Sequence, residues 1–99
     1  LLTAQAIDAQ HALEIGLINR IVPAGDLMTV ALGAADTIAA NAPLAVRATR
    51  RGVREILPLA LPEAYERQET IGRPLRRTED AREAQRAFIE KRRPTFSGK

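Results

Sequence analysis

Prolines interrupt this chain at short intervals, and this feature limits the chain to short helical segments. A proline has no backbone N–H to donate and its ring fixes φ, so it ends a helix or stands in the helix's first turn. Between the prolines, apolar residues recur at the three- and four-residue spacing typical of helices with one buried face. The sequence therefore predicts a mainly α chain of about five helices, punctuated by six prolines: Pro23, Pro43, Pro58, Pro62, Pro74 and Pro94.

The first segment predicts a helix followed by one short strand. Asp8 is suited to accept a backbone N–H at the start of the helix, and Gly16 can take the left-handed conformation that ends a helix. Residues 17–22 then have the pattern of an extended strand, which Pro23 closes because it cannot donate to a strand ladder. This segment is expected to set the path of the backbone, and it contains few residues suited to catalysis.

Residues that favour caps delimit the next two helices. We expect one helix to begin at Asp26 as its N-cap and to end near Asn41. Another should have Pro43 near its first position and run to about Leu57. Basic residues of this helix recur at i, i+3, i+4 and i+7, so they share one face. They are Arg47, Arg50, Arg51 and Arg54.

Two further helices are expected in the last third of the chain. One starts near Pro62 and should be kinked or frayed by Gly72 and Pro74. The other has Thr78 as its N-cap, with acidic residues in its first turn, where carboxylates meet the positive end of the helix dipole. Its end is marked by three consecutive cations and then Pro94, which leaves a short tail.

Composition adds limits on class and location. A chain of 99 residues fits at most one small domain, and with aromatic residues at 3% its core is shallow. The absence of cysteine excludes disulfides, thiol nucleophiles and thiolate metal sites. No apolar run approaches the roughly 18 residues that span a bilayer. These features favour a soluble cytoplasmic protein with no membrane partner, and a start at Leu-Leu suggests a piece of something longer.

Few residues are candidates for catalysis or metal binding. His11, the single histidine, is predicted on the polar side of its helix and lacks an identifiable catalytic partner. No metal-binding or phosphate-loop motif occurs. Two sets of neighbouring acidic residues lie among arginines and are interpreted as solvated helix faces. They are Glu66 with Glu69, and Glu79 and Asp80 with Glu83. We therefore predict no catalytic residue and no metal site in this chain.

Three separated motifs resemble one known family. They are IDAQHALEIGLINRIVP, ANAPLAVRATRRGVRE and TEDAREAQRAFIEKRRPTFSGK, in that order. Together they resemble the C-terminal portion of the crotonase, or enoyl-CoA hydratase/isomerase, superfamily. Two departures stand out: Ala4 replaces a glycine that is usual after Leu-Thr, and Gly72-Arg73-Pro74 occupies a stretch where relatives often carry bulky aromatics. The second departure bears on the apolar cover over the coenzyme.

The resemblance implies a fold, a substrate and an assembly. It places residues 1–23 as the last helix and crossing strand of an α/β, ββα-spiral core, and residues 24–99 as a C-terminal helical lobe. That lobe would support trimers, or dimers of trimers, and cover coenzyme A. The implied substrate is an acyl-CoA thioester, without a prosthetic group. The oxyanion hole and catalytic carboxylates would precede this segment, so its partner is its own N-terminal catalytic core.

One candidate ligand site remains inside the chain. Phe88 and Lys91 are three apart on the last predicted helix, so an aromatic face and an ammonium share one side. The resemblance implies that they help cover coenzyme A. Alternatively, Phe88 anchors the core and Lys91 serves the helix dipole. Arg92 and Arg93 are expected to add less specific phosphate attraction, and Phe96 to pin the tail to the protein surface.

Charge distribution raises two alternative functions. Residues 1–45 carry one arginine against four acidic residues, whereas residues 46–99 carry fourteen lysines or arginines against eight. A small helical nucleic-acid-binding protein would use the arginine face of the third helix against phosphates. Nearby glutamates and the scarcity of stacking aromatics argue against a nucleic-acid partner. A purely structural oligomerisation module is the other alternative.

Overall fold

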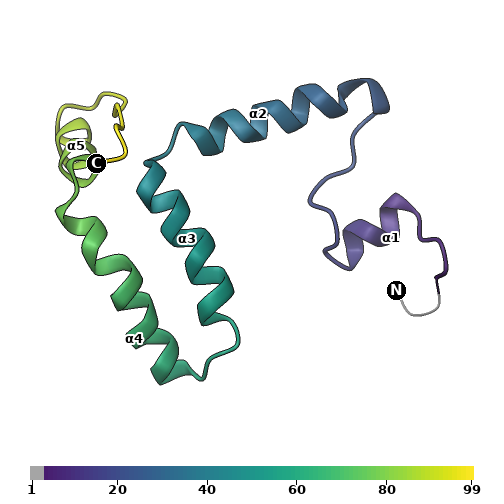
Figure 1. Cartoon of the computed structure of the whole chain (residues 1–99). Helices are drawn as coiled ribbons and strands as arrows, with labels where there is room; N and C mark the ends of the chain where they lie inside the picture. The colour runs from purple at the N-terminus through teal and green to yellow at the C-terminus, as the bar shows by residue number, and fades with distance from the viewer. Residues whose placement is uncertain (1–3) are drawn as a thin grey trace. The chain divides into compact units, whose positions relative to one another are not determined.

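The computed structural model describes residues 4–99, and the regular elements of this part of the chain are all helices, joined by irregular segments (Figure 1). Two compact units divide within the second helix: one reaches to Ala34 and the other covers Ala35–Lys99. The resemblance implies a different boundary, between a core segment at residues 1–23 and a C-terminal lobe at residues 24–99. That boundary separates two functional roles and stays a prediction. The mainly α character of the chain is confirmed.

The first helix, α1, covers Ala9–Glu14 and is capped as expected at its start. The Asp8 carboxylate accepts the backbone N–H of His11 at 2.7 Å. Ala12, on the same helix, is buried with 7% of its surface exposed. Ahead of the helix, Ala4 has φ +52, a left-handed conformation that favours glycine.

The end of α1 forms a two-bond reversal around a glycine. Gly16 has φ +72, and its N–H donates to the carbonyl of Leu13 at 3.0 Å. The next N–H, from Leu17, donates to the carbonyl of Ala12 at 2.8 Å. These two bonds define a Schellman motif, in which a left-handed residue directly after the C-cap lets both N–H groups satisfy carbonyls of the last turn. The predicted role of Gly16 is confirmed.

The predicted short strand is not present. Residues 17–22 are irregular, and no residue between 4 and 99 is in a strand. A strand is defined by hydrogen bonds to a neighbouring strand, and the described chain supplies none. The apolar pattern alone did not make a strand, because a sheet requires a partner.

The second helix, α2, covers Leu27–Ala39 and follows a 3₁₀ turn at Ala24–Asp26. Asp26 is the last residue of that turn and directly precedes α2, as predicted, and its role as an N-cap stays a prediction. At the other end the prediction is confirmed. The side-chain amide of Asn41 donates to the carbonyl of Thr37 at 2.7 Å and satisfies one of the last carbonyls of the helix.

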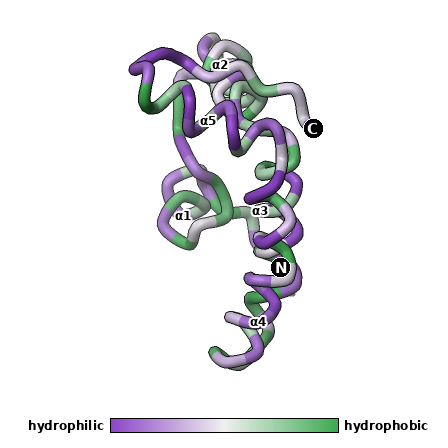
Figure 2. Tube along the Cα trace, turned by 90° about the vertical axis from the view of Figure 1, so that its left-hand side faces the viewer, coloured by the Kyte–Doolittle hydropathy of each residue, from purple (hydrophilic) through white to green (hydrophobic). Residues whose placement is uncertain are grey.

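Helices α3 (Pro43–Ile56) and α4 (Leu61–Gly72) pack side by side as an antiparallel hairpin (Figure 1). Pro43 stands in the first turn of α3, where its missing N–H costs no helical bond. Figure 2 shows hydrophilic and hydrophobic residues mixed along both helices, as expected for helices with one apolar side. The expected starts of both helices are correct to within one residue.

An ion-pair bridge joins α3 to α4. The carboxylate of Glu55 accepts from Arg51 at 2.8 Å within α3, and from Nε of Arg67 on α4 at 2.6 Å. The hydrogen bond from Arg51, together with that from Arg67, holds the pKa of Glu55 below its ordinary value. Part of the basic face of α3 is thus neutralised by its own chain.

The last helix, α5, covers Glu79–Ile89 and is reached through a 3₁₀ segment at Arg73–Arg77. The predicted disturbance at Gly72 and Pro74 is confirmed, because α4 ends at Gly72 and the tighter 3₁₀ turn follows. Thr78 is the N-cap, and its hydroxyl accepts the N–H of Ala81 at 3.1 Å. The start of α5 is therefore set by a local hydrogen bond.

Very little of the described chain is buried. Ala12 and Ala87 are the buried apolar residues among residues 4–99, and Asp80 is the buried charged one. Large apolar side chains on α2, such as Leu27, Met28 and Leu32, are more than half exposed. Within the described chain no single helix has the length and apolarity needed to cross a membrane, although one bent pair passes on those two criteria.

Candidate functional site

The end of α5 repeats the reversal found at the end of α1, with a lysine in place of glycine. Lys91 has φ +54, its N–H donates to the carbonyl of Phe88 at 3.3 Å, and the N–H of Arg92 donates to the carbonyl of Ala87 at 3.0 Å. The helix ends at Ile89, two residues before the lysine. The prediction that both residues lie on the last helix and share one of its sides is therefore wrong for Lys91, which follows the helix, although Phe88 and Lys91 belong to one hydrogen-bonded turn.

Both predicted ligand residues of this turn are exposed. Phe88 has 85% of its surface exposed and its neighbour Ile89 has 78%, so Phe88 does not anchor the core of this unit. Lys91 is exposed as well. An exposed aromatic ring and an ammonium in one turn form a surface suited to stack on a flat ring and to bind an anion. Their roles toward a ligand remain a prediction.

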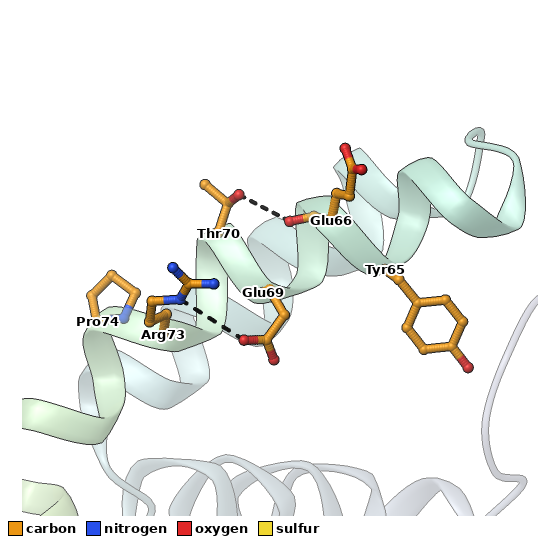
Figure 3. Close-up of a pocket in the computed structure, with 6 residues that line it drawn as sticks. All are labelled: Tyr65, Glu66, Glu69, Thr70, Arg73 and Pro74. Atoms are coloured by element: carbon orange, nitrogen blue, oxygen red, sulfur yellow. Dashed lines mark hydrogen bonds and ion pairs between the residues drawn. The ribbon is translucent and has the colours of Figure 1, made fainter.

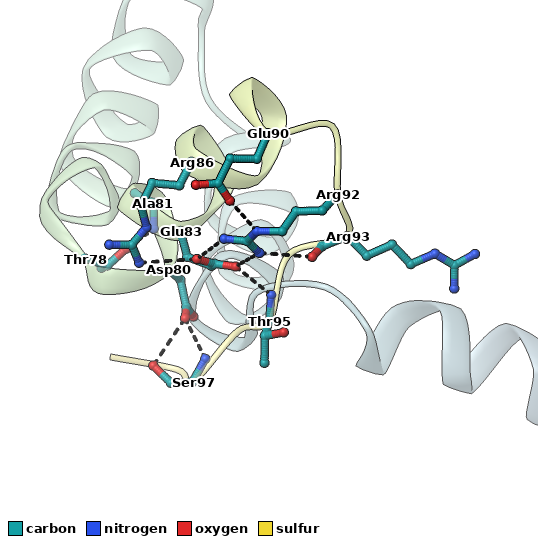
Figure 4. A network of polar contacts seen from close by, with 10 residues as sticks. All are labelled: Thr78, Asp80, Ala81, Glu83, Arg86, Glu90, Arg92, Arg93, Thr95 and Ser97. Atoms are coloured by element: carbon teal, nitrogen blue, oxygen red, sulfur yellow. Dashed lines mark hydrogen bonds and ion pairs between the residues drawn. The ribbon is translucent and has the colours of Figure 1, made fainter.

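Arg92 is engaged in a side-chain network (Figure 4). Its Nη1 and Nη2 donate to the two carboxylate oxygens of Glu83 at 2.5 and 3.0 Å, and its Nε donates to Glu90 at 2.5 Å. The prediction that Arg92 would attract phosphate is therefore not supported, because its guanidinium already binds two carboxylates. Arg93 points away from the network in Figure 4.

Glu83 is the centre of that network. Its side chain is 12% exposed and also accepts the backbone N–H of Thr95 at 3.0 Å. The hydrogen bonds from Arg92, first, and from Thr95 lower the pKa of Glu83 to about 2, against the opposing effect of burial. Glu83 is therefore ionised throughout the physiological pH range and serves as a fixed acceptor.

Asp80 holds the far end of the tail. One of its carboxylate oxygens accepts the N–H of Ser97 at 2.7 Å, and the other accepts the N–H of Gly98 at 2.9 Å. Phe96 is half-buried and lines a small cavity with Leu44 and Ala84, which confirms that it pins the tail. The interpretation of Asp80 and Glu83 as solvated acids is wrong, because both are turned to backbone and side-chain donors of the tail.

The other carboxylate group behaves as predicted. Figure 3 shows one side of α4, where Glu69 pairs with Arg73 at 3.9 Å. Glu69 also binds Arg76 at 2.8 Å. The hydroxyl of Thr70 donates to the backbone carbonyl of Glu66 at 2.9 Å. These are charge-balanced surface contacts, and they do not form an acid and base aimed at a common point.

The remaining candidates carry no site. His11 is exposed, and its Nδ1 lies 3.9 Å from the Glu14 carboxylate, which is a weak contact. Among residues 4–99 no cluster of histidine and acidic side chains could hold a metal ion. The four arginines of α3 line one shallow surface hollow together with Glu55, as their spacing predicted. No stacking aromatic lines that hollow, so nothing in it favours a nucleic acid.

A family model described as "Enoyl-CoA hydratase/isomerase" matches residues 1–99, the whole chain. The chain belongs to this family. Among curated relatives, enoyl-CoA hydratase EchA19 of Mycobacterium tuberculosis is 44% identical over 99 residues, which cover 100% of this chain and 37% of the relative. Carnitinyl-CoA dehydratase of Proteus mirabilis is 39% identical over 104 residues, covering 100% of this chain and 40% of that protein.

Solved structures of the same family match the chain in three dimensions. An enoyl-CoA hydratase/isomerase from Mycobacterium paratuberculosis matches with a TM-score of 0.88 and 44% identity, over 94% of this chain and 37% of that one. An enoyl-CoA hydratase/isomerase structure from Mycobacterium abscessus matches with a TM-score of 0.92 and 36% identity, and the match covers 100% of this chain and 41% of that one. The chain thus spans about two-fifths of its relatives' length and corresponds to the C-terminal portion of a crotonase-fold protein.

Proposed function

We propose that this chain supplies closure over coenzyme A, and subunit assembly, to an enzyme that acts on acyl-CoA thioesters. The observation that carries the proposal is the exposed turn that contains Phe88 and Lys91. Names of relatives such as enoyl-CoA hydratase support the substrate class. Hydration of a 2-enoyl thioester in the cytoplasm, without a prosthetic group, is the reaction we assign to the whole protein.

The two side chains suit the nucleotide end of coenzyme A. A phenyl ring with most of its surface exposed can stack on adenine, and base–aromatic stacking contributes about 1–3 kcal/mol. A lysine ammonium is a compact charge that binds phosphate. Because the nucleotide does not change during the reaction, these contacts should lower KM without raising kcat.

Assembly is supported by the exposure of apolar side chains. Alanines supply the buried apolar residues of the described chain, whereas Leu27, Leu57 and Leu61 are more than half exposed. Large apolar side chains that are exposed in this way are typical of an interface. We propose that these faces contact the N-terminal catalytic core and neighbouring subunits in a homotrimer or a dimer of trimers.

Chemistry is assigned to the part of the protein that precedes this segment. Several carboxylates of the described chain have other partners: Glu69 forms surface ion pairs, and Asp80 and Glu83 bind the tail. The acid and base for proton transfer and the donors for the thioester oxyanion are therefore assigned to the preceding part. The isolated 99-residue chain is therefore expected to lack hydratase activity and to self-associate.

A fusion protein tests the proposal. This chain is joined to the amino-terminal part of M. tuberculosis enoyl-CoA hydratase EchA19 that precedes the matched segment, and steady-state hydration is measured on crotonyl-CoA and on a crotonyl pantetheine thioester. Phe88→Ala and Lys91→Ala should each raise KM for crotonyl-CoA by about tenfold, equivalent to about 1.4 kcal/mol, with kcat within a few-fold. Neither change should affect the thioester that lacks the nucleotide.

The pantetheine thioester distinguishes coenzyme binding from general damage. Loss of activity on both substrates together with a lower melting temperature would mean that Phe88 serves packing in the assembled protein. Leu57→Ala is a useful comparison, because Leu57 is 79% exposed in the chain alone and is assigned to assembly. That change should lower the oligomeric mass measured by ultracentrifugation before it alters KM.

A further inference from the structure

We infer that Glu83 and Arg92 are positioning residues for the coenzyme contact: they hold the turn that carries Phe88 and Lys91 in its left-handed form. This inference rests on the proposed function of that turn. It concerns residues that touch no ligand and act through the backbone on either side of Lys91.

Lys91 occupies a conformation that a lysine disfavours. At φ +54 its Cβ crowds the backbone, and glycine is the common residue at this position of a Schellman motif. Such a conformation persists only when surrounding contacts enforce it. The two backbone bonds of the turn, at 3.0 and 3.3 Å, are part of that enforcement. The lysine side chain therefore occupies this position at a cost in free energy that glycine would avoid.

The guanidinium of Arg92 links the residue after Lys91 to the residue before it. Arg92 follows Lys91 in the chain, and its Nε donates to the carboxylate of Glu90, the residue that precedes Lys91. Its two terminal nitrogens bind both oxygens of Glu83, which lies two turns back along α5 (Figure 4). The residues before and after Lys91 are therefore tied to one rigid, planar group that is fixed to the body of the helix.

Glu83 also fixes the chain that leaves the turn. The same carboxylate accepts the N–H of Thr95, and its side chain is only 12% exposed. A two-pronged pair between arginine and carboxylate has a defined geometry, unlike a single exposed ion pair. The low pKa of Glu83, about 2, keeps this geometry in place at any physiological pH. The turn is thus held from its helix side and its tail side.

Glu83→Gln in the fusion protein tests the inference. The amide keeps the shape of the side chain but can no longer bind the guanidinium with two acceptor oxygens. KM for crotonyl-CoA should rise about threefold to tenfold, a smaller effect than loss of the lysine itself, while kcat and the pantetheine thioester stay within a few-fold. The matched control is Glu79→Gln, the same charge change in the first turn of α5, which should leave KM unchanged.

A double-mutant cycle separates positioning from stability. If Glu83 acts through Lys91, then adding Glu83→Gln to Lys91→Ala should raise KM no further. If the Glu83→Gln variant folds less well, Arg92→Lys is the second test. It keeps the positive charge but loses the forked guanidinium, and it should raise KM for crotonyl-CoA by a similar factor. Equal losses on both substrates, or additive effects in the double variant, would overturn the inference.

The outcomes also separate this inference from the proposed function. If Lys91→Ala itself leaves KM for crotonyl-CoA unchanged, the coenzyme contact is absent and the proposed function fails. If Lys91→Ala raises KM but Glu83→Gln and Arg92→Lys do not, the contact exists and the positioning role fails. The expected result is a raised KM in all three variants, confined to the substrate that carries the nucleotide.

Discussion

The ends of α1 and α5 have the same backbone hydrogen bonds but different residues at the left-handed position. Gly16 and Lys91 have φ +72 and +54, and each is followed by an N–H that returns to the helix at 2.8 or 3.0 Å. At Gly16 an added Cβ would meet no atom within 4 Å, so only the conformation calls for glycine there. At Lys91 a side chain is kept despite the strain. The first turn directs the chain, whereas the second presents a functional group.

A second contrast concerns what holds each turn. The helix of Gly16 is capped by Asp8, which bonds a residue three positions away. The turn of Lys91 is held by Glu83 and by a tail that Asp80 binds across seventeen and eighteen positions. A strained turn thus depends on distant contacts, and an unstrained one does not. The following predictions test this difference, in decreasing order of effect.

Asp80→Ala should have the largest effect on stability. The change removes the acceptor of two backbone N–H groups, and hydrogen bonds to charged groups contribute about 1.5–3 kcal/mol each. We expect the fusion protein to lose about 3 kcal/mol in denaturant unfolding, with the tail released from α5. Asp36→Ala, an exposed aspartate on α2, is the control and should change little. An unchanged unfolding free energy for Asp80→Ala would contradict the role of the tail.

Gly16→Ala should destabilise the protein by about 1 kcal/mol, because alanine is strained at positive φ. In a protein of the relatives' length this corresponds to a fall of about 2–4 °C in melting temperature. No steric contact adds to the cost, since the space around the new methyl group is open. KM for either substrate should stay the same. A raised KM would show that this turn, too, serves the ligand.

Local signals in the sequence predicted local structure well. Asp8, Gly16 and Thr78 each act within four residues of their position, so their hydrogen bonds can be read from spacing. The strand expected at residues 17–22 failed because it needs a partner elsewhere. Spacing singled out Phe88 and Lys91, and family resemblance supplied their predicted coenzyme role, whereas nothing in the spacing reveals the left-handed turn at Lys91.

The network around Glu83 was missed for a related reason. Two of its donors, Arg92 and Thr95, lie nine and twelve positions away, beyond helical periodicity, and only Arg86 donates from helical spacing, three positions away. For the long-range contacts, the sequence offers only a glutamate within α5 and an arginine between the end of that helix and Pro94. That signal fits a solvated face equally well. Only the returning course of the tail reveals that Glu83 and Asp80 are acceptors for backbone groups.

Glu83 should make stability depend on pH in a defined window. Its pKa is lowered from 4.5 in the unfolded chain to about 2 in the folded one, so its contribution is complete above pH 4.5. The contribution is lost as the pH falls through the range down to about 2. The stability difference between the fusion and its Glu83→Gln variant should therefore be constant from pH 8 to 5 and shrink toward pH 2. Unfolding curves at several pH values measure this, and a difference that persists at pH 2 would contradict the cause assigned to the shift.

His11→Gln should have the smallest effect. The imidazole is exposed and its contact with Glu14 is long at 3.9 Å, so stability should change by no more than about 0.5 kcal/mol. Values of kcat and KM should be unaltered on both substrates. A fall in kcat would place chemistry beside α1, where the comparison of the two turns assigns only a role in directing the backbone.

The most direct test of the central claim is Lys91→Gly in the fusion protein, measured by thermal unfolding and by calorimetric titration with coenzyme A. Glycine relieves the left-handed strain, so the melting temperature should rise by about 2–4 °C. Loss of the ammonium should weaken coenzyme A binding about tenfold and leave pantetheine binding unchanged. Stabilisation with unchanged affinity for coenzyme A would contradict the claim that a strained lysine is kept in this turn to bind the coenzyme.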